Sequence, residues 1–267
     1  MNLEEILKDV IEISKNAGHE ILKIYNDKKK FKEVSFKDDN SPLTLADKAA
    51  NKIICDTLKL LTPDIPLLSE EGLKTKYNER KHWNEFWLID PLDGTKEFIK
   101  RNGEFTVNIA LIKNGKPILG VVHAPVLNMT WYGGMNLGSY KINKNQSIEK
   151  INVIKKIDNN KTIKIVSSRS HANNPKLDAY ISKYKNYQLI KMGSSIKICL
   201  VADGSAHFYP RFGPTMEWDT GAAHAVVKYA GGNIINMNSN IELSYNKSSL
   251  LNPEFLVNNE KNIKHEN

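Results

Sequence analysis

The sequence of 267 residues predicts a mixed α/β fold, with an α+β first half and an α/β second half. Apolar residues recur with a helical period near the N-terminus, and strands joined by an Asn-Gly turn occupy the middle of the chain. Beyond about residue 160, strand and helix patterns alternate. We therefore expect two parts, roughly 1–150 and 151–267. The polar stretch 140–162 is either their boundary or only exposed edge strands.

Residues 3–25 predict the first element, an amphipathic helix with one buried face, because their apolar residues repeat every 3.6 positions. Residues 30–44 combine weak alternation with turn residues, which is typical of a short strand and a loop. Thr44 then begins a second helix, which Pro63 and Pro66 end. We expect its inward face to carry Leu45, Ala49, Ile53, Ile54 and Leu58.

The middle of the chain predicts strands. PLLSEEG (66–72) reads as a short strand that leads into a glycine turn. FWLIDPLDGT (86–95) is an apolar run that stops abruptly at an acid, where Pro91 requires a turn because proline cannot donate to a strand ladder. The following strands, within 105–134, are joined by Asn114-Gly115, the strongest short-range signal for a hairpin.

The second half predicts strands and helices in alternation. Strands are expected within 162–170, 187–193 and 205–212, and helices within 175–184, 194–204 and 217–232.

Composition limits the class of protein. The hydrophobic and charged fractions, 40% and 25%, are ordinary for a soluble globular chain. No stretch is apolar for long enough to span a membrane, and the N-terminus carries acids where a signal peptide needs a basic start. We expect a cytoplasmic protein, and peripheral association with the inner face of the cell membrane stays open.

The formal charge of +8 comes from scattered lysines, without an arginine-rich helix or an aromatic-studded basic stripe. A solvated surface is the simplest interpretation, and attraction of a phosphorylated ligand is the second. Binding to a nucleic acid polymer is the least favoured of the three, so we expect a small molecule as the binding partner.

The segment FWLIDPLDGTKEF (86–98) carries the most informative acids. Asp90 and Asp93 lie on a tight turn and can point at one place, with the Leu92 carbonyl between them. Carboxylates and a carbonyl are oxygen ligands, which suit Mg²⁺. Gly94 and Thr95 would offer N–H groups at a helix start, where a phosphate is attracted. The alternative is a plain Asp-Gly turn that Asp90 caps.

Two further acids stand at element ends. Glu70 follows a predicted strand and could simply be solvated, and Asp219 opens the last long helix and could be its N-cap. Together with Asp90 and Asp93, however, they would repel one another strongly without cations. Two or three Mg²⁺ would neutralise these carboxylates and bind a phosphate, activating a water and stabilising the leaving oxygen.

The motifs SEEG (69–72), DPLDGTKEF (90–98), WDTGAAHAV (218–226) and DDNSPLTLAD (38–47) resemble those of the inositol monophosphatase-like superfamily of lithium-sensitive, Mg²⁺-dependent phosphatases. The resemblance implies a layered αβαβα sandwich of the sugar-phosphatase type, with the active site between the two parts. It also implies roles for individual residues. The expected metal ligands are Glu70, Asp90, the Leu92 carbonyl, Asp93 and Asp219, and the phosphate contacts are Gly94 and Thr95. The expected catalytic residues are Asp47, Thr95 and Glu70, with Thr95 and Asp47 helping to activate the attacking water.

Asp47 has a second interpretation, because Thr44-x-x-Asp47 is also a capping-box-like pair at a helix start. Both roles can coexist.

Within this superfamily, DNSPLTLAD, SSRSH (167–171), GSSIK (193–197), ADGSAHFYPRFGPTMEWDT (202–220) and LNPEFLV (251–257) resemble bacterial 3'(2'),5'-bisphosphate nucleotidases. The resemblance adds substrate contacts at His171, Ser194, Lys197 and Arg211, beside Glu70, Leu92, Asp93 and Asp219. Cationic donors away from the metals suit a nucleotide with a second phosphate. Alternatives are a surface histidine, a helix N-cap at Ser194, an exposed lysine, and an arginine stacked on an aromatic ring.

The expected reaction is Mg²⁺-dependent hydrolysis of the 3'-phosphate of adenosine 3',5'-bisphosphate, giving AMP and phosphate, in sulfur assimilation or nucleotide housekeeping. The sulfated relative, 3'-phosphoadenylyl sulfate, is a second expected substrate. Two alternatives remain open: an inositol or fructose phosphatase of the same superfamily, and a non-catalytic nucleotide sensor. The sequence does not predict the oligomeric state.

Overall fold

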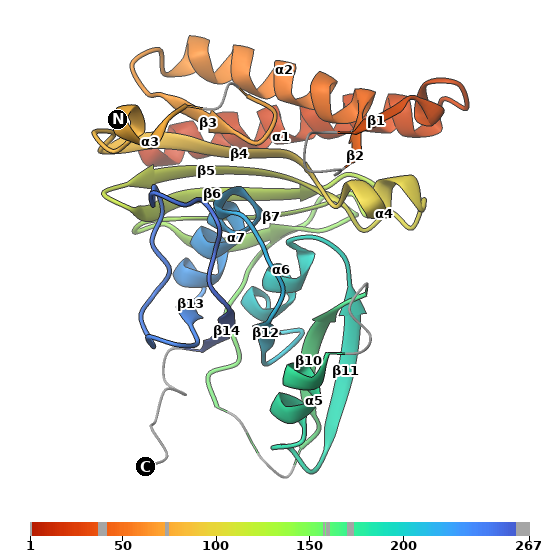
Figure 1. Ribbon diagram of the computed structural model, residues 1–267, viewed down its shortest axis with the longest axis vertical. Helices are drawn as coiled ribbons and strands as arrows, with labels where there is room; N and C mark the ends of the chain where they lie inside the picture. Colours follow the sequence, from red (N-terminus) through yellow and green to blue (C-terminus); the bar gives the residue numbers. More distant parts are fainter. Residues whose placement is uncertain are drawn as a thin grey trace.

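The structure, a computed structural model, describes residues 2–36, 42–72, 75–156, 158, 161–169 and 174–259. Its elements stack as a helix pair, a seven-stranded sheet, a second helix pair, a second layer of strands and a short outer helix (Figure 1). This order confirms the predicted αβαβα sandwich. The smaller elements at the periphery are η1 (Lys30–Lys32), β1 (Val34–Phe36), β2 (Pro42–Thr44), α3 (Tyr77–Arg80) and α4 (Thr95–Ile99).

The first layer consists of α1 (Leu3–Asn26) and α2 (Leu45–Leu61), as the apolar periodicity predicts. All five residues predicted to face inward contact the core: Ile54 and Leu58 are buried, and Leu45, Ala49 and Ile53 are half-buried against it. The rotation of the helix also buries Ala46, Asp47 and Ala50, which the sequence did not place on this face. The small alanines let α2 pack closely, and the same rotation turns Asp47 into the protein.

The seven-stranded sheet has the order β3-β4-β5-β6-β7-β8-β9, with β3 parallel to β4 and all other pairs antiparallel. Asn114 and Gly115 both have positive φ (50° and 72°), which confirms the predicted hairpin turn. The strands are β3 (Leu67–Ser69), β4 (Glu85–Asp93), β5 (Thr106–Lys113), β6 (Lys116–Ala124), β7 (Met129–Gly134), β8 (Gly138–Ile142) and β9 (Ile148–Lys150). Because β9 is exposed at the sheet edge, this part of 140–162 forms edge strands, while the domain division at 150 stays a prediction.

Strand β4 corrects the prediction that the chain turns at Pro91. Asp90 pairs with Asn108 and Asp93 pairs with Thr106, so β4 uses one residue more than β5 between these pairs. Proline has no N–H to donate, and the ladder therefore bulges past it and resumes at Asp93. A bulge redirects side chains, and here it lies between the two aspartates of the strand.

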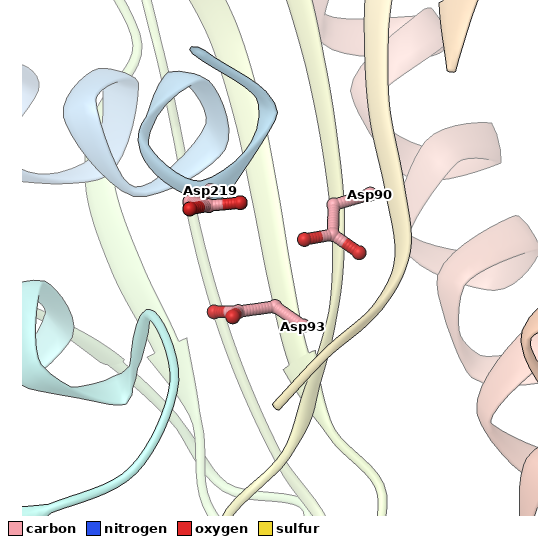
Figure 2. Close-up of side chains that lie close together, drawn as sticks. All are labelled: Asp90, Asp93 and Asp219. Atoms are coloured by element: carbon pink, nitrogen blue, oxygen red, sulfur yellow. The ribbon is translucent and has the colours of Figure 1, made fainter. Parts of the chain in front are cut away.

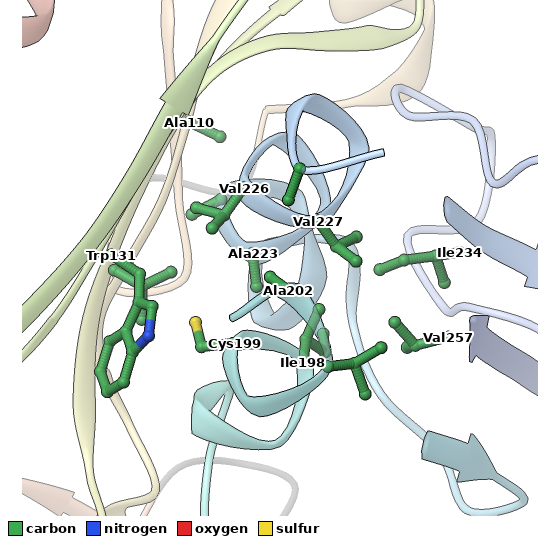
Figure 3. Close-up of a cluster of buried hydrophobic side chains, with 14 of the residues drawn as sticks. Ala110, Trp131, Ile198, Cys199, Ala202, Ala223, Val226, Val227, Ile234 and Val257 are labelled. Carbon is green, nitrogen blue, oxygen red and sulfur yellow. The ribbon is translucent and has the colours of Figure 1, made fainter. Parts of the chain in front are cut away.

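The third layer is α6 (Ile196–Ala202) and α7 (Glu217–Tyr229), which cover the other face of the sheet. Helix α7 approaches β6 so closely that a Cβ added at Gly120 would lie 2.2 Å from the Ala222 carbonyl oxygen. Figure 3 shows the cluster that these helices share with both neighbouring layers, including Trp131, Cys199, Val226 and Val257. Helix α7 therefore lies directly against the sheet.

The fourth layer contains an antiparallel sheet, in the order β12-β14-β13, and the parallel pair β10–β11. A bridge between Ile165 and Phe208 connects the two. The sequence did not predict β13 and β14. The strands are β10 (Ile163–Ser168), β11 (Tyr187–Met192), β12 (Tyr209–Arg211), β13 (Gly232–Asn236) and β14 (Phe255–Asn259), and α5 (Pro175–Ile181) covers their outer face through a small apolar cluster. Among the described residues, no helix is long and apolar enough to cross a membrane.

Candidate active site

Three carboxylates converge where β4 ends and α7 begins. One ligand-capable oxygen each of Asp90, Asp93 and Asp219 lies within 4.8 Å of the other two. Figure 2 shows the two β4 aspartates facing the aspartate from the first turn of α7. Asp90 is 1% exposed, and the other two are half-buried. Segments 126 positions apart in the chain thus meet at one cluster of hard oxygen donors.

Glu70 joins this cluster from the end of β3. Its backbone N–H donates to the Ile89 carbonyl (3.1 Å), which carries the chain alongside β4 for one residue beyond the strand. Its side chain forms a hydrogen bond with Asp90, and its charge acts on Asp93 and Asp219 as well. The four carboxylates that the sequence singled out are therefore neighbours.

Burial and mutual repulsion raise the pKa values of Asp90, Asp93 and Asp219. Burial, followed by the charges of its acidic neighbours, raises the pKa of Asp90 well above its usual range. Burial and then the charge of Asp93 raise the pKa of Asp219 to about 8. Burial also raises the pKa of Asp93 to about 6, against the opposing charge of Lys197. A divalent cation would remove this repulsion, so the donor set fits a hard metal ion.

The raised pKa values predict how pH and Mg²⁺ act together on stability. An unfolded aspartate has a pKa of about 3.9, so between about pH 4 and 8 the metal-free folded state binds more protons than the unfolded state. The free energy of unfolding of the metal-free protein is therefore expected to fall as pH rises. Mg²⁺ should then raise the melting temperature more at pH 8 than at pH 5.5, by roughly 2–4 °C for each kcal/mol regained.

Thermal unfolding at both pH values, with MgCl₂ or with NaCl of equal ionic strength, measures this difference. Because other titrating groups are present in both samples, their contributions cancel. A Mg²⁺-induced rise that is as large at pH 5.5 as at pH 8 would contradict the assignment.

Asp47 makes both contacts that the sequence left open, the capping box with Thr44 and the hydrogen bond with Thr95. Its Oδ2 accepts hydrogen bonds from the Thr44 backbone N–H (2.7 Å) and hydroxyl (2.5 Å), which makes the capping box of α2. Its Oδ1 accepts from the Thr95 hydroxyl at 3.3 Å. Burial raises the pKa of Asp47 to about 6. One carboxylate thus both caps a helix and reaches the residue that begins α4.

The turn between β4 and α4 brings Thr95 next to the acids. Gly94 has φ +95°, and a Cβ there would be strained, so glycine suits this turn. The Thr95 hydroxyl lies 3.4 Å from the Leu92 carbonyl oxygen and can donate to it instead of to Asp47. Leu92 donates its own N–H to the Asp90 carboxylate (3.0 Å). Leu92, Gly94 and Thr95 therefore lie in one turn beside the acidic cluster.

A pocket of about 180 Å³ adjoins the acids and includes Asp93 and Asp219 in its wall. Ser194, Lys197 and Arg211 line the same pocket. Lys197 is 7% exposed, which excludes the alternative of a solvent-exposed helix lysine. Its ammonium donates to the Ser194 carbonyl (2.5 Å), and burial lowers its pKa to about 8 despite the nearby Asp93.

The structure decides some of the remaining alternatives. The N-cap interpretation of Asp219 was wrong in position: Met216 is the cap, and Asp219, at the third helical position, accepts its N–H (2.9 Å). The cap of α6 is Ser195, although the Ser194 hydroxyl accepts from the Ile196 N–H (3.4 Å). The Arg211 guanidinium donates to the carbonyls of Gly213 (3.2 Å) and Pro214 (3.0 Å). His171 lies outside the described residues.

The sequence reasoning missed several residues of this pocket. Ser195 donates its backbone N–H to Asp93 Oδ2 (2.5 Å), and the pocket wall also includes Lys96, the buried Glu97 and Ser168. Lys96 and Glu97 stand in the segment DPLDGTKEF (90–98), in which the predicted site residues ended at Thr95. Nothing in the local pattern marks Ser195 as a neighbour of Asp93.

Comparison with known proteins places the chain in a family. The sequence model of the Inositol monophosphatase family matches residues 2–266. The chain belongs to the inositol monophosphatase family. Members of this family are metal-dependent phosphatases, which agrees with the acidic cluster.

Three relatives within the family share much of the sequence. The 3'(2'),5'-bisphosphate nucleotidase CysQ of Escherichia coli (strain K12) is 48% identical over 94% of this chain and 99% of its own. The CysQ of Buchnera aphidicola is 47% identical over 86% of this chain and 84% of its own. The crystal structure of CysQ from Bacteroides thetaiotaomicron superposes with a TM-score of 0.84 at 42% identity, over 97% and 98% of the two chains. An IMPase from Thermotoga maritima shares the inositol monophosphatase fold with a TM-score of 0.75 at 24% identity.

Proposed function

We propose that this protein is a Mg²⁺-dependent phosphatase that converts adenosine 3',5'-bisphosphate to AMP and phosphate. The observation that carries the proposal is a pocket whose wall includes Asp93 and Asp219 of the acidic cluster and the cationic side chains of Lys96, Lys197 and Arg211. A substrate with two phosphates fits this combination, because one phosphate can meet the acids through a metal and the other can meet Lys197 and Arg211. The similarity to CysQ nucleotidases supports the same substrate. We expect 3'-phosphoadenylyl sulfate to be a second substrate.

The acids hold the reacting end of the substrate in this proposal. The proposed Mg²⁺ ligands are the carboxylates of Glu70, Asp90, Asp93 and Asp219 and the Leu92 carbonyl. When bound, Mg²⁺ would supply a Lewis acid that activates water and stabilises the leaving oxygen. Each ligand comes from the end of a separate element or from the β4 bulge. These anchored positions keep the oxygen atoms preorganised.

Thr95 and Asp47 orient the attacking water in this proposal. The Thr95 hydroxyl can accept a hydrogen bond from that water when it donates its own proton to Asp47 Oδ1, 3.3 Å away. The capping box holds Asp47 through its other oxygen, so Oδ1 stays in place to accept the proton of the Thr95 hydroxyl. The backbone N–H groups of Gly94 and Thr95 then face the reacting phosphate. Attack is in line at phosphorus, without a phospho-enzyme.

Phosphate release from a set of esters tests the proposed substrate. We expect kcat/KM for adenosine 3',5'-bisphosphate to exceed the value for inositol 1-phosphate by at least about 100-fold, because inositol 1-phosphate has no second phosphate for Lys197 and Arg211 to bind. Fructose 1,6-bisphosphate has two phosphates but no nucleoside, and we expect its kcat/KM to be lower as well. A preference for either sugar ester would make the chain a different phosphatase of the family. Tight nucleotide binding without phosphate release in Mg²⁺ would indicate a sensor.

Removal of the Lys197 charge is expected to change substrate preference. A hydrogen bond to a charged group contributes about 1.5–3 kcal/mol, so Lys197→Ala should lower kcat/KM for adenosine 3',5'-bisphosphate about 10- to 100-fold. The effect on 3'-AMP, which lacks the second phosphate, should be much smaller. The measured quantity is the ratio of kcat/KM for the two substrates. Arg211→Ala should change this ratio in the same direction.

Two controls accompany this measurement. Because Lys197 is buried, Lys197→Met keeps the aliphatic volume and removes only the charge. Lys185→Ala removes an exposed lysine outside the pocket. The ratio of kcat/KM for the two substrates could be unchanged in Lys197→Ala, Lys197→Met and Arg211→Ala. In that case neither Lys197 nor Arg211 binds the second phosphate, and the substrate is an unspecified phosphate monoester.

A further inference from the structure

Three side chains in the β5 region point at one loop of the second half of the chain. Glu104, Thr106 and Asn108 alternate along an extended segment, so they share one face. Glu104 Oε2 accepts the Gly193 N–H (2.8 Å), and the Thr106 hydroxyl lies 2.8 Å from the Ser195 hydroxyl. The Ser195 hydroxyl in turn donates to Asn108 Oδ1 (2.8 Å). Because that hydroxyl has one proton, Thr106 is the donor to Ser195. We call these three residues the β5 row.

The loop that the row holds connects directly to the candidate site. Ser194 lies between the two anchored residues with φ +48°, a left-handed conformation that a non-glycine residue keeps only when its surroundings impose it. Its carbonyl oxygen accepts a hydrogen bond from the ammonium of Lys197 (2.5 Å). The next residue donates its backbone N–H to Asp93 Oδ2 (2.5 Å). A change in the loop would therefore move both the buried cation and a partner of an acid.

The β5 row is tightly packed against the loop, and one of its buried polar groups lowers the stability of the fold. A Cβ added at Gly193 would lie 2.6 Å from the Glu104 carbonyl oxygen and 2.8 Å from Glu97 Cγ, so the loop backbone is wedged against this segment. Asn108 is 1% exposed, and its Nδ2 has no hydrogen-bond partner in the described part of the chain. A buried unpaired donor costs stability. Packing of the sheet alone therefore does not explain an asparagine at this position.

We propose that Glu104, Thr106 and Asn108 are positioning residues, which hold the 193–195 loop so that Lys197 faces the second phosphate of the substrate. The inference rests on the proposed function for the identity of that phosphate, and on geometry alone for the loop. The β5 row touches the loop and not the reacting atoms. Its effect on catalysis is transmitted through Ser194 and Lys197.

Thr106 offers a matched pair of variants. Thr106→Val keeps the shape and removes the hydroxyl, whereas Thr106→Ser keeps the hydroxyl. Loss of one buried hydrogen bond is expected to lower kcat/KM for adenosine 3',5'-bisphosphate about 10-fold in the valine variant, mainly through KM. The serine variant should stay within about twofold of the wild type. For 3'-AMP the two variants should differ much less.

Hydrogen exchange gives a second readout that does not depend on the substrate. The amide protons of Gly193 and Ser195 are both donated to side-chain carboxylates, so a peptide spanning 193–197 should exchange faster in Thr106→Val than in Thr106→Ser. Glu104→Ala removes the acceptor of the Gly193 N–H, together with the ion pair between Glu104 and Arg169. It should accelerate exchange of the same peptide and so serves if the valine variant does not fold.

The outcomes separate the inference from the proposed function. In a Lys197→Met background the effect of Thr106→Val on kcat/KM should shrink, because the two residues act as a unit. Unchanged exchange of 193–197 in both Thr106→Val and Glu104→Ala, or an undiminished valine effect in that background, would overturn the positioning role. If the wild-type enzyme does not cleave the bisphosphate, the proposed function fails, while the exchange experiment still decides whether the row holds the loop.

Discussion

Replacement of Asp93 by asparagine is expected to lower kcat by about 10²- to 10³-fold, the size of effect seen when one preorganised electrostatic group is removed from a transition state. Asparagine has nearly the same volume and keeps an oxygen that can accept the Ser195 N–H, so the loop contact survives. The charge that the site offers to a metal ion does not. Phosphate release at saturating Mg²⁺ and substrate measures the effect.

The same variant should remain folded. Removing a charge from a cluster of repelling carboxylates does not destabilise the metal-free protein, so its melting temperature should equal or exceed that of the wild type. Asp64→Asn, at an exposed position between α2 and β3, is the matched control and should retain full activity. Near-normal turnover by Asp93→Asn at the same Mg²⁺ concentration would remove Asp93 from the metal site.

Removal of divalent cations is expected to abolish activity completely and reversibly. Without a cation, the buried acids take up protons or repel the incoming phosphate, since their pKa values lie above the usual range. After treatment with EDTA and removal of the chelator, phosphate release should be undetectable. Addition of MgCl₂ should restore it, and NaCl of equal ionic strength should not. Residual turnover in the presence of excess EDTA would contradict a metal-dependent reaction.

The candidate acids could be found from the sequence because each stands at the end of an element. Asp90 and Asp93 end an apolar run, Glu70 follows a short strand, and Asp219 opens a helix. Element ends meet at the edge of a layered fold, so local patterns were enough to group them. The family resemblance then supplied Asp47, whose turn toward Thr95 depends on the rotation of α2.

Contacts that depend on tertiary packing could not be predicted in this way. The β4 bulge arises because the strand continues pairing with β5 beyond a proline, which the local sequence alone argues against. The contact between Thr106 and Ser195 joins residues 89 positions apart, and neither residue carries a local signal. Strands β13 and β14 are short, and they become strands by pairing with each other and with β12.

The identity of the cleaved bond is the most direct test of the account. Adenosine 3',5'-bisphosphate is incubated with the enzyme and Mg²⁺ in H₂¹⁸O, and the nucleotide and phosphate are analysed by mass spectrometry. Attack of water at phosphorus on the metal side of the pocket, with the other phosphate held by Lys197 and Arg211, predicts unlabelled 5'-AMP and phosphate with one ¹⁸O atom. Formation of 3'-AMP, ¹⁸O in the nucleotide, or no turnover would contradict it.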